Sequence, residues 1–338
     1  MNSMSKNVTV TRGSPVKPGF PATVGRGADA DCAGIAVVTV TYNPDPKILE
    51  RQLSQLPSAA LKIIVDNASR SELRIETQRV AAAYAAIYLQ NSSNTGLPAA
   101  LNQGARHAGK IRPACRFLLL LDQDTEPGAG CVERLVASYD RIATAFGKAC
   151  CIGPRLVDVS TGLDHGFHQI RGWRWSRKFP SSDSQIPVPL ANINGSGTLI
   201  PLKIFNELNG LEDDLFIDLV DAEWSFRVLA AGYGLYGVPD ITFRHRMGER
   251  GLRFWLLHWR VWPERSPQRN YYLFRNAVWL MRRSYVPGVW KVWAVVKLAI
   301  TVLVYLAVDS KRDEHMRYMW KGLREGLAGT AKDCNRST

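Results

Sequence analysis

Two carboxylates one residue apart, Asp122 and Asp124, follow the apolar run 117–121. Alternate side chains of an extended chain face the same way, so both carboxylates can reach one ligand while Gln123 turns away. With His245, at the end of a later β-like run, they form a mixed oxygen and nitrogen set that suits Mn²⁺ or Mg²⁺ bridging phosphates. On spacing alone, a single histidine is more often structural than a ligand.

A second acidic group spans residues 212–223, around the start of an expected helix. Asp218 and Asp221 bracket the turn before that helix, where the helix dipole favours a carboxylate pointing into a cleft. This is a workable place for a general base. In the alternative interpretation, Asp221 caps the helix and Glu223 pairs with Arg227, four residues further on.

Alternating strands and helices must position these groups. Unbroken apolar, β-branched strands predict an α/β fold, with a mainly parallel sheet covered by helices on both faces. Ligands bind beyond the carboxyl ends of such strands, so Thr41, Asn43 and Asp66 become candidate site residues. Asp66 alone is equally well explained as a turn former or helix cap. The strands are expected at 35–43, 61–67 and 116–124, and the helices at 46–55, 71–84 and 97–109.

Three connecting segments have compositions that suit ligand contact. The polar loop that opens segment 91–108 leads into a helix and predicts free backbone N–H groups for phosphate, without the spacing of a dinucleotide fingerprint or P-loop. Residues 171–179 mix aromatics and arginines, which favours a flap over a ligand; a surface hairpin is the alternative. The small residues in 191–200 permit close approach of a ligand to the backbone.

Seven blocks occur in a fixed order between residues 35 and 283: VVTVTYNPD, IIVDNAS, NTGLPAALNQGARHA, LLLLDQDTEP, NGSGTLIP, LFIDLVDAEWSFRV and SPQRNYYLFRN. The ordered set resembles bacterial family 2 glycosyltransferases, most closely the rhamnosyltransferase group. The resemblance implies a GT-A fold, in which one Rossmann-like sheet domain holds a nucleotide sugar. It places the acceptor half on the later strands and helices.

The resemblance also implies a role for each matching residue. Asp124 and His245 would bind the metal, and Asp122 would contact the sugar or ribose. Asp221 would be the catalytic base that takes the proton of the acceptor hydroxyl. Further donor contacts are expected from Asp66 at the pyrimidine base, Asn94 and Gly96 along the nucleotide, and Trp224 beside a sugar, while candidate acceptor or phosphate contacts are Asp218, Arg269, Tyr272 and Arg275.

These roles predict a transfer that inverts the anomeric centre. The expected donor is dTDP-L-rhamnose, with a UDP-hexose as the alternative, and the expected acceptor is a saccharide or a lipid-linked saccharide of a cell-surface polysaccharide. A nucleotidyltransferase is a weaker alternative, because only Lys47 near the first strand could meet a triphosphate. In a third alternative, a non-catalytic polysaccharide-binding or membrane-binding scaffold, the acidic cluster would have no particular geometry.

The net charge of +13 is concentrated near the C-terminus, where residues 244–338 hold 19 Lys and Arg against 7 Asp and Glu. The apolar stretch 292–308, interrupted only by Lys297, is shorter than the roughly 20 residues of a spanning helix. It is interpreted as an interfacial helix on a membrane surface, with a buried core helix as the alternative. A nucleic-acid partner is not expected, since no recognition motif accompanies the charge. The flanking basic residues are Arg282, Arg283, Lys291, Lys311 and Arg312.

The six cysteines show no metal-binding or redox spacing, and the N-terminus lacks the apolar core of a secretory signal. A reduced, cytoplasmic setting follows, with peripheral attachment to the inner face of the cell membrane. The expected organisation is a disordered leader at 1–33, a GT-A catalytic domain at 34–250, and a basic helical region at 251–338 that carries the interfacial helix.

Overall fold

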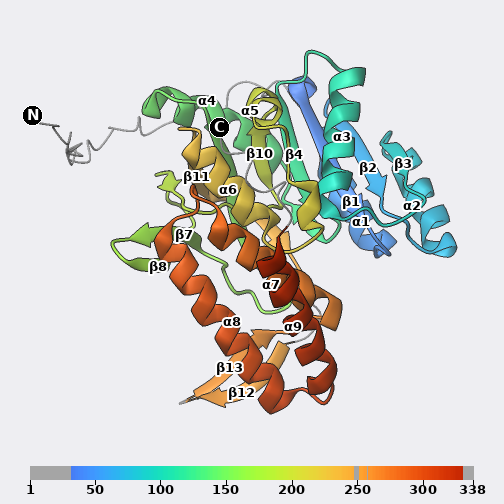
Figure 1. Cartoon of the computed structure of the whole chain (residues 1–338). Coiled ribbons are helices and arrows are strands. Elements are labelled where there is room, and N and C mark those ends of the chain that lie inside the picture. Colours follow the sequence, from blue (N-terminus) through green and yellow to red (C-terminus); the bar gives the residue numbers. More distant parts are fainter. Residues whose placement is uncertain (1–31, 247–250, 257, 330–338) are drawn as a thin grey trace, which may run out of the picture.

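The computed structural model describes residues 32–246, 251–256 and 258–329, so nearly all of the expected leader lies outside the described residues. After a short 3-10 turn, η1 (Cys32–Gly34), strands and helices alternate through the first half of the chain (Figure 1). The strands there are β1 (Ile35–Thr41), β2 (Leu61–Asp66), β3 (Ile87–Gln90), β4 (Phe117–Asp122) and β5 (Thr125–Pro127), and the helices are α1 (Pro46–Ser54), α2 (Ser71–Ala83), α3 (Leu97–Ile111) and α4 (Cys131–Phe146). The predictions of three strands and three helices are confirmed, although each strand ends one or two residues earlier than predicted and the helix ends shift by one or two residues.

The main sheet has the order β3-β2-β1-β4-β10-β6-β11-β5. Strands β3, β2, β1 and β4 are parallel, as predicted. Successive strands are added on one side of β1 as far as β3, and β4 then pairs with β1 on its other side. Beyond β4 the sheet is mixed, because β10 runs antiparallel to both β4 and β6. The later strands are β6 (Cys150–Asp158), β7 (Phe167–Arg171), β8 (Arg174–Lys178), β9 (Val188–Pro189), β10 (Thr198–Pro201), β11 (Gly234–His245), β12 (Gly251–Leu256) and β13 (His258–Pro263).

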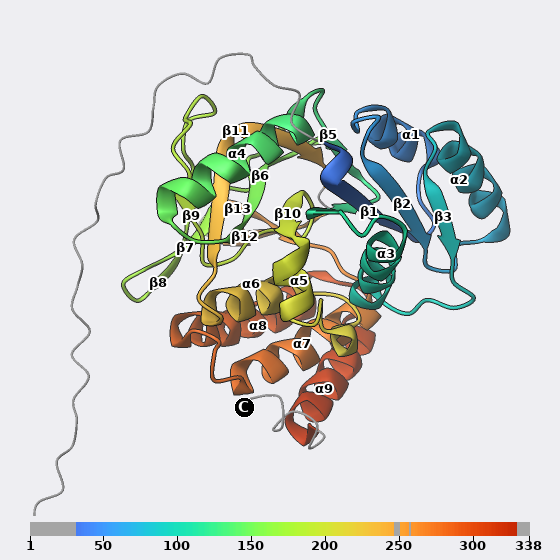
Figure 2. The same cartoon turned by 90° about the horizontal axis from the view of Figure 1, so that it is seen from above.

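Alternation along the central strands separates two hydrophobic cores. On β1, Ile35 and Val37 face the side covered by α1, α2 and α4, whereas Ala36 and Val38 face the other side. That other side is covered by α3, α5 (Leu202–Glu207) and α6 (Val220–Ala230), and Figure 2 shows the helices on both faces of the sheet. Burial on both faces explains why these strands are apolar throughout.

Three helices follow the sheet: α7 (Pro267–Arg282), α8 (Gly288–Val308) and α9 (Arg312–Ala328). Leu280 of α7 and Trp290 of α8 belong to the same core as Val38 and Val65, so the stretches before and after residue 250 share one core. Helix α9 packs closely on α7, because a β-carbon at Gly322 would lie 2.3 Å from the Tyr271 carbonyl oxygen.

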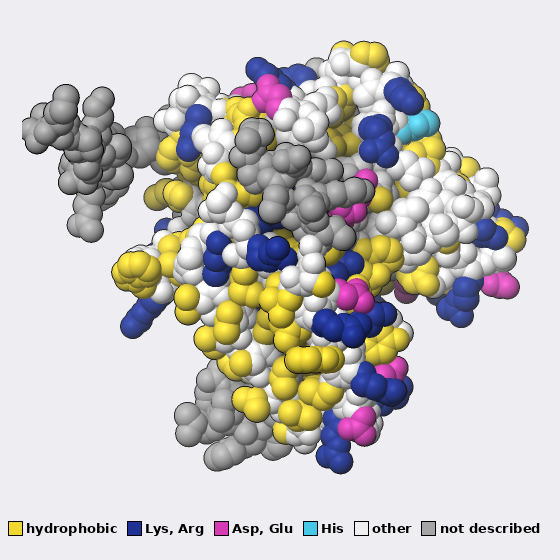
Figure 3. All heavy atoms as spheres, viewed as in Figure 1, with side chains coloured by type: hydrophobic (Ala, Val, Ile, Leu, Met, Phe, Trp, Pro, Cys, Tyr) yellow, Lys and Arg dark blue, Asp and Glu magenta, His cyan; other side chains and the backbone are white. Residues whose placement is uncertain are grey.

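Helix α8 is 21 residues long, so it is longer than the predicted 17-residue segment, and its most apolar window has a mean hydropathy of 2.0, so that the helix is long and apolar enough to cross a membrane. Only 22% of its most apolar window is buried, so the alternative of a buried core helix is wrong. Its exposed apolar side chains lie at helical spacing, and Figure 3 shows a hydrophobic surface over this helix. This apolar face of α8 consists of Val292, Val295, Val296, Ala299, Ile300, Leu303, Leu306 and Ala307.

Residues 171–179 lie mostly in a β7–β8 hairpin. Trp175 of this hairpin packs on Phe226 of α6 and Trp293 of α8, with ring centroids 6.3 and 5.8 Å away. Trp173, at the turn, is 92% exposed. The segment therefore forms a hairpin that aromatic packing holds against two helices, and its contact with a ligand stays a prediction.

Candidate active site

Asp122, Asp124 and His245 come together as predicted. One ligand atom from each side chain lies within 4.8 Å of the others, although His245 is far away in the sequence. The His245 Nδ1 is 3.5 Å from Asp124 Oδ1. Two carboxylate oxygens and one imidazole nitrogen fit a hard divalent cation such as Mg²⁺ or Mn²⁺ and leave positions for other ligands.

Strand pairing brings His245 to this place. The register of β6 and β11 shifts between Val238 and Thr242, and β11 then pairs with β5, so that His245 lies opposite Thr125. The Thr125 hydroxyl is 2.7 Å from His245 Nδ1 and 2.7 Å from the Ser196 hydroxyl. When Nδ1 donates its proton to Thr125, Nε2 keeps its lone pair for a metal.

Gln52 of α1 holds the turn that carries the two carboxylates, and sequence reasoning missed it. Its Nε2 donates to the backbone carbonyls of Asp122 (2.7 Å) and Thr125 (2.6 Å), and its Oε1 accepts from the Thr39 hydroxyl (2.8 Å). The residue is fully buried. The available signal was a polar side chain on a helix face that is otherwise formed by Ile48, Leu49 and Leu53.

Burial disfavours the ionised form of both carboxylates when no cation is bound between them. It raises the pKa of Asp122 to about 6, an effect that His245 opposes and that the charges of Asp124 and Asp221 reinforce. It also raises the pKa of Asp124, again opposed by His245. A divalent cation would remove this mutual repulsion, so the electrostatics of the site fit a metal as well as its ligand atoms do.

Asp221 lies in the first turn of α6, and the N-cap position is occupied by Leu219, so the capping alternative is wrong. Its Oδ1 accepts a hydrogen bond from the backbone N–H of Ala222 at 2.9 Å, and the Asn192 side chain bonds to it as well. Burial raises its pKa, opposed by the hydrogen bond from Ala222 and then by the charge of Lys297. A carboxylate with a raised pKa is a stronger proton acceptor when ionised.

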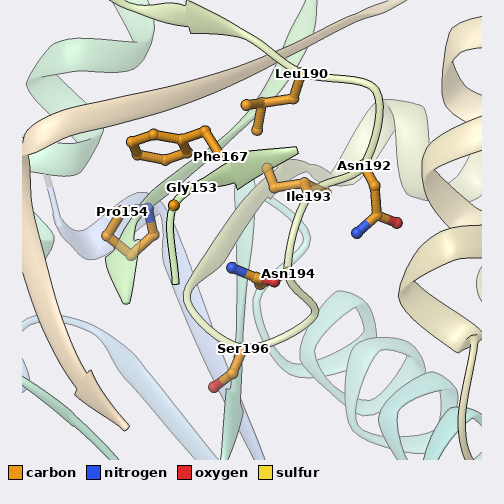
Figure 4. Close-up of a pocket in the computed structure, with 9 residues that line it drawn as sticks. Gly153, Pro154, Phe167, Leu190, Asn192, Ile193, Asn194 and Ser196 are labelled. Carbon is orange, nitrogen blue, oxygen red and sulfur yellow. The ribbon is translucent and has the colours of Figure 1, made fainter. Parts of the chain in front are cut away.

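The loop beside Asp221 comes from the small-residue segment that leads into β10. A β-carbon on Gly195 would lie 3.6 Å from Asp221 Cβ, so the backbone passes directly beside the carboxylate. Figure 4 shows Asn192, Asn194 and Ser196 along this loop, next to a cavity whose volume of about 10 Å³ has room for a water molecule but not a sugar. Ser196 accepts a hydrogen bond from the Asp122 N–H at 2.8 Å, which ties the loop to the metal-binding turn.

Asp218 is not free to act as a base. Its carboxylate accepts two hydrogen bonds from Arg269, at 2.7 and 3.1 Å, and lies 3.8 Å from Arg265. Its backbone has a φ of 61°, and Asn276 donates to its carbonyl at 3.0 Å. These contacts indicate that Asp218 shapes the turn before α6 and orients Arg269.

At the end of β2, Asp66 accepts hydrogen bonds from the Thr41 hydroxyl (3.1 Å) and from the Ser69 N–H (3.0 Å). The turn-forming role is therefore present, and the side chain is fully buried. Asn43, with a φ of 50°, donates its N–H to the Ser69 hydroxyl, and its side chain accepts from the Arg70 N–H. Thr41, Asn43 and Asp66 thus lie together at the strand ends, as the sequence predicts.

Several N–H groups in the loop before α3 already have partners within the protein, so fewer are left for phosphate than the sequence predicts. The N–H of Thr95 donates to Asn67, that of Gly96 to Asn94, and that of Leu97 to the carbonyl of Phe216. These contacts fix a sharp turn in which Gly96 has a φ of 86°, and a β-carbon there would lie 2.7 Å from the Phe216 ring. The loop is braced by its own side chains and by the turn after η2 (Asp213–Leu215).

Three further candidates, Trp224, Arg275 and Tyr272, contact other parts of the protein instead of the strand ends. Trp224 is 2% exposed and packs in the core against Phe205, so it offers almost no surface to a sugar. Arg275 donates to the carbonyls of Asp214 and Leu215 and lies over the ring of Trp279, so its guanidinium braces η2.

Tyr272 stacks on Phe216 with ring centroids 4.7 Å apart, which assigns it to the same brace as Arg275. Arg269 is different, because its charge acts on Asp122 as well as on Asp218. Of the four candidate acceptor or phosphate contacts, Arg269 is the one whose charge reaches the metal-binding carboxylates.

A parallel half-sheet with two carboxylates, an imidazole and a separate carboxylate beyond its strand ends defines a nucleotide-sugar-dependent glycosyltransferase of the GT-A class. The sequence model of the family described as "Glycosyl transferase family 2" matches residues 36–208, just over half of the chain. The chain belongs to that family, and it is a glycosyltransferase.

Two known proteins show how far the similarity extends. The chain is 25% identical to the dTDP-rhamnosyl transferase RfbF of Shigella flexneri over 298 residues, which cover 88% of this chain and 96% of that protein. It is also similar in fold to a crystal structure of GalNAc-T7 with UDP, GalNAc and Mn²⁺, at a TM-score of 0.51 and 19% identity, over 63% of this chain and 43% of that one. The chain thus spans less than half the length of that structure.

Proposed function

We propose that this chain transfers L-rhamnose from dTDP-L-rhamnose to a saccharide or lipid-linked saccharide during cell-surface polysaccharide synthesis, with inversion at the anomeric carbon. The observation that carries the proposal is the similarity to a dTDP-rhamnosyl transferase over 88% of this chain and 96% of that protein. The family fold and the grouping of Asp122, Asp124 and His245 support it. A β-L-rhamnosyl donor would give an α-L-rhamnoside.

Asp221 acts as the base in this proposal. An acceptor hydroxyl is a poor nucleophile, so a carboxylate must take its proton as the new C–O bond forms. The raised pKa of Asp221 supports this role, as do its hydrogen bond from the Ala222 N–H and the effect of its charge on Asp122. Attack from the face opposite the leaving diphosphate inverts the anomeric centre.

Asp124 and His245 would hold Mn²⁺ or Mg²⁺, and Asp122 would contact the ribose or sugar beside it. The bound ion would supply charge neutralisation for the leaving nucleoside diphosphate. Arg269 stands close enough for its charge to act on Asp122, and Asp218 holds its guanidinium in place. Thr41, Asn43, Asp66, Asn94 and Gly96 lie around the strand ends and are proposed to line the nucleotide.

We also propose that the apolar face of α8 lies on the inner surface of the cell membrane. The exposed row of apolar side chains supports this location. The predicted basic flank supports membrane binding less than expected, because Arg282, Arg283 and Lys291 bond to internal carbonyl or carboxylate groups. Lys311 and Arg312 remain exposed near the end of the helix.

A donor panel tests the enzymatic proposal. Purified protein with Mn²⁺ is given dTDP-L-rhamnose, UDP-glucose or UDP-N-acetylglucosamine, and release of the nucleoside diphosphate is measured together with protection against thermal unfolding. We expect dTDP-L-rhamnose to be hydrolysed fastest and to raise the melting temperature most, since a ligand that binds only the native state stabilises it. Preference for a UDP-sugar in both readouts would replace the donor assignment.

Vesicle sedimentation tests the membrane proposal. Wild-type protein and the variant Leu303→Glu are mixed with vesicles that contain anionic lipid, at low and high salt. Leu303 is 64% exposed, so the charge should weaken vesicle binding without disturbing the fold. Equal sedimentation of the two proteins would show that this face does not meet the lipid.

A further inference from the structure

The β7–β8 hairpin ends in a turn that carries an exposed tryptophan. Arg171 pairs with Arg174, so the loop between the two strands consists of Gly172 and Trp173. Gly172 has a φ of 57°, which suits the first position of such a loop, whereas the residue that follows is usually small and polar. Trp173 is instead 92% exposed. The chain therefore presents a large aromatic side chain to the outside at a position where folding does not require one.

The two arginines beside this loop carry charge that the described residues leave unbalanced. Arg171 and Arg174 are both exposed, and neither side chain forms an ion pair or a hydrogen bond within the described part of the chain. They also lie directly opposite each other on paired strands, where two like charges are destabilising. An anion bound at the tip of the hairpin would relieve this repulsion.

The hairpin is fixed beside the apolar face of α8. The Trp175 ring of β8 packs on Trp293 of α8, with ring centroids 5.8 Å apart. Val292, the next residue to Trp293 on α8, is 68% exposed and belongs to the apolar face. Figures 1 and 2 show the hairpin beside α8 in both views, and Figure 3 shows it at the edge of the hydrophobic surface over this helix. The tip of the hairpin thus borders the apolar face.

An apolar helix face that lies in a membrane surface is usually bordered by cations that meet anionic lipid headgroups. The basic residues near the start of α8 do not provide this border, because Arg282, Arg283 and Lys291 are bonded to groups inside the protein. The hairpin tip provides two exposed cations instead. Tryptophan is enriched at the level of the lipid headgroups, so the composition of the tip fits the same surface.

We propose that the tip of the β7–β8 hairpin is a second membrane contact, in which Arg171 and Arg174 bind anionic phospholipid headgroups and Trp173 enters the headgroup layer. The proposal rests on the membrane location proposed for α8, to which it adds a class of lipid and a second point of attachment. A single helix can roll about its long axis on a surface, whereas two contacts fix the orientation of the protein. Trp175 also packs on α6, the helix that carries Asp221, so the hairpin joins the membrane contact to that helix.

Sedimentation with vesicles of two compositions tests the tip. The full chain is mixed with vesicles of phosphatidylcholine alone, or of phosphatidylcholine with phosphatidylglycerol, at low and high salt. The double variant Arg171→Gln/Arg174→Gln should bind the anionic vesicles roughly 25-fold more weakly at low salt, about fivefold for each charge, and should bind phosphatidylcholine as the wild type does. Trp173→Ala should weaken binding to both kinds of vesicle roughly tenfold.

Matched controls remove the same kinds of side chain from α2 and α3, which Figure 1 shows on the other side of the molecule from the hairpin. Arg79→Gln/Arg106→Gln removes two exposed arginines, and Ile75→Ala shortens an apolar side chain that is 55% exposed. Both controls should bind the two kinds of vesicle as the wild type does. Wild-type binding of anionic vesicles by the hairpin double variant, with an unchanged melting temperature, would overturn the proposal. An equal loss of binding to phosphatidylcholine would overturn the assignment to anionic lipid.

Leu303→Glu separates this proposal from the one on which it rests. Loss of vesicle binding in Leu303→Glu, with wild-type binding in the tip variants, would exclude the hairpin and leave the membrane location of α8 standing. Wild-type binding in all of these variants would overturn both proposals. Unchanged vesicle binding of the tip variants, together with weaker binding to heparin as a soluble anionic glycan, would assign the tip to a glycan and overturn the lipid. Hydrolysis of dTDP-L-rhamnose should stay unchanged in the tip variants, so the enzymatic proposal is tested separately.

Discussion

Replacement of Gln52 tests how the metal-binding turn is held. In Gln52→Leu the carbonyls of Asp122 and Thr125 lose their buried donor, and the Thr39 hydroxyl loses its acceptor. Each unsatisfied buried group costs about 1–3 kcal/mol, partly offset by the added apolar surface, so we expect a net loss of roughly 2–4 kcal/mol in the free energy of unfolding. The two released carbonyls belong to the turn that carries Asp122 and Asp124, so metal affinity should fall about 10- to 100-fold.

The assay is the Mn²⁺ dependence of dTDP-L-rhamnose hydrolysis, with thermal unfolding measured in parallel. Leu53→Ala is the matched control, since Leu53 is a buried neighbour on the same helix that makes no hydrogen bond to the turn. It should lower stability by a similar amount, about 2–5 kcal/mol, and leave the half-saturating Mn²⁺ concentration unchanged. If both variants kept wild-type Mn²⁺ affinity, Gln52 would be a stabilising residue without influence on the site.

Three further predictions concern the charged groups and the histidine. Asp221→Asn should retain Mn²⁺-dependent donor binding and lose transfer by 100-fold or more, roughly the contribution of a general base; full transfer by a folded variant would remove Asp221 from that role. Without metal, stability should fall as the pH rises from the ordinary Asp pKa of 3.8 to about 6, because native Asp122 holds its proton more tightly than the unfolded chain does. Asp122→Asn should flatten this pH dependence of the melting temperature. An unchanged pH dependence in the variant would assign the effect to other groups. Thr125→Val should weaken Mn²⁺ binding about 10-fold by removing the partner of His245 Nδ1, whereas Thr125→Ser should restore it; equal affinity in both variants would show that the hydroxyl does not orient the imidazole.

The donor half of the site could be predicted from the sequence because its residues follow strands. Asp66 and Asp122 each end an apolar run, and parallel strands bring their carboxyl ends to one edge of a sheet. His245 was a candidate ligand from its residue type, and the resemblance to the family made it the expected one. Its position depends on the register shift in β11, where Pro239 marks an interruption of the strand but does not give the direction or size of the shift.

The contacts that brace the site were not predictable in the same way. Asn94 and Tyr272 are polar residues in matching motifs, yet the structure uses Asn94 to close its own loop and Tyr272 to stack on Phe216. Trp224 lies in a helix whose inner face is decided by packing against Phe205 and the sheet. A motif gives the type of a residue, whereas the direction of its side chain follows from tertiary packing.

The metal-binding residues and the cations whose charges act on Asp122 and Asp221 lie on different parts of the fold. This difference explains why the sequence predicts the metal-binding residues more readily. The metal-binding group lies on strands and strand ends. The cations Arg269, Lys297 and Arg265 come from α7, α8 and the segment before α7. Asp221 lies at the start of α6, and the charge of Lys297 lowers its pKa against the effect of burial. A change in the position of α8 would therefore alter the pKa of Asp221, while the metal-binding residues on the sheet stayed in place.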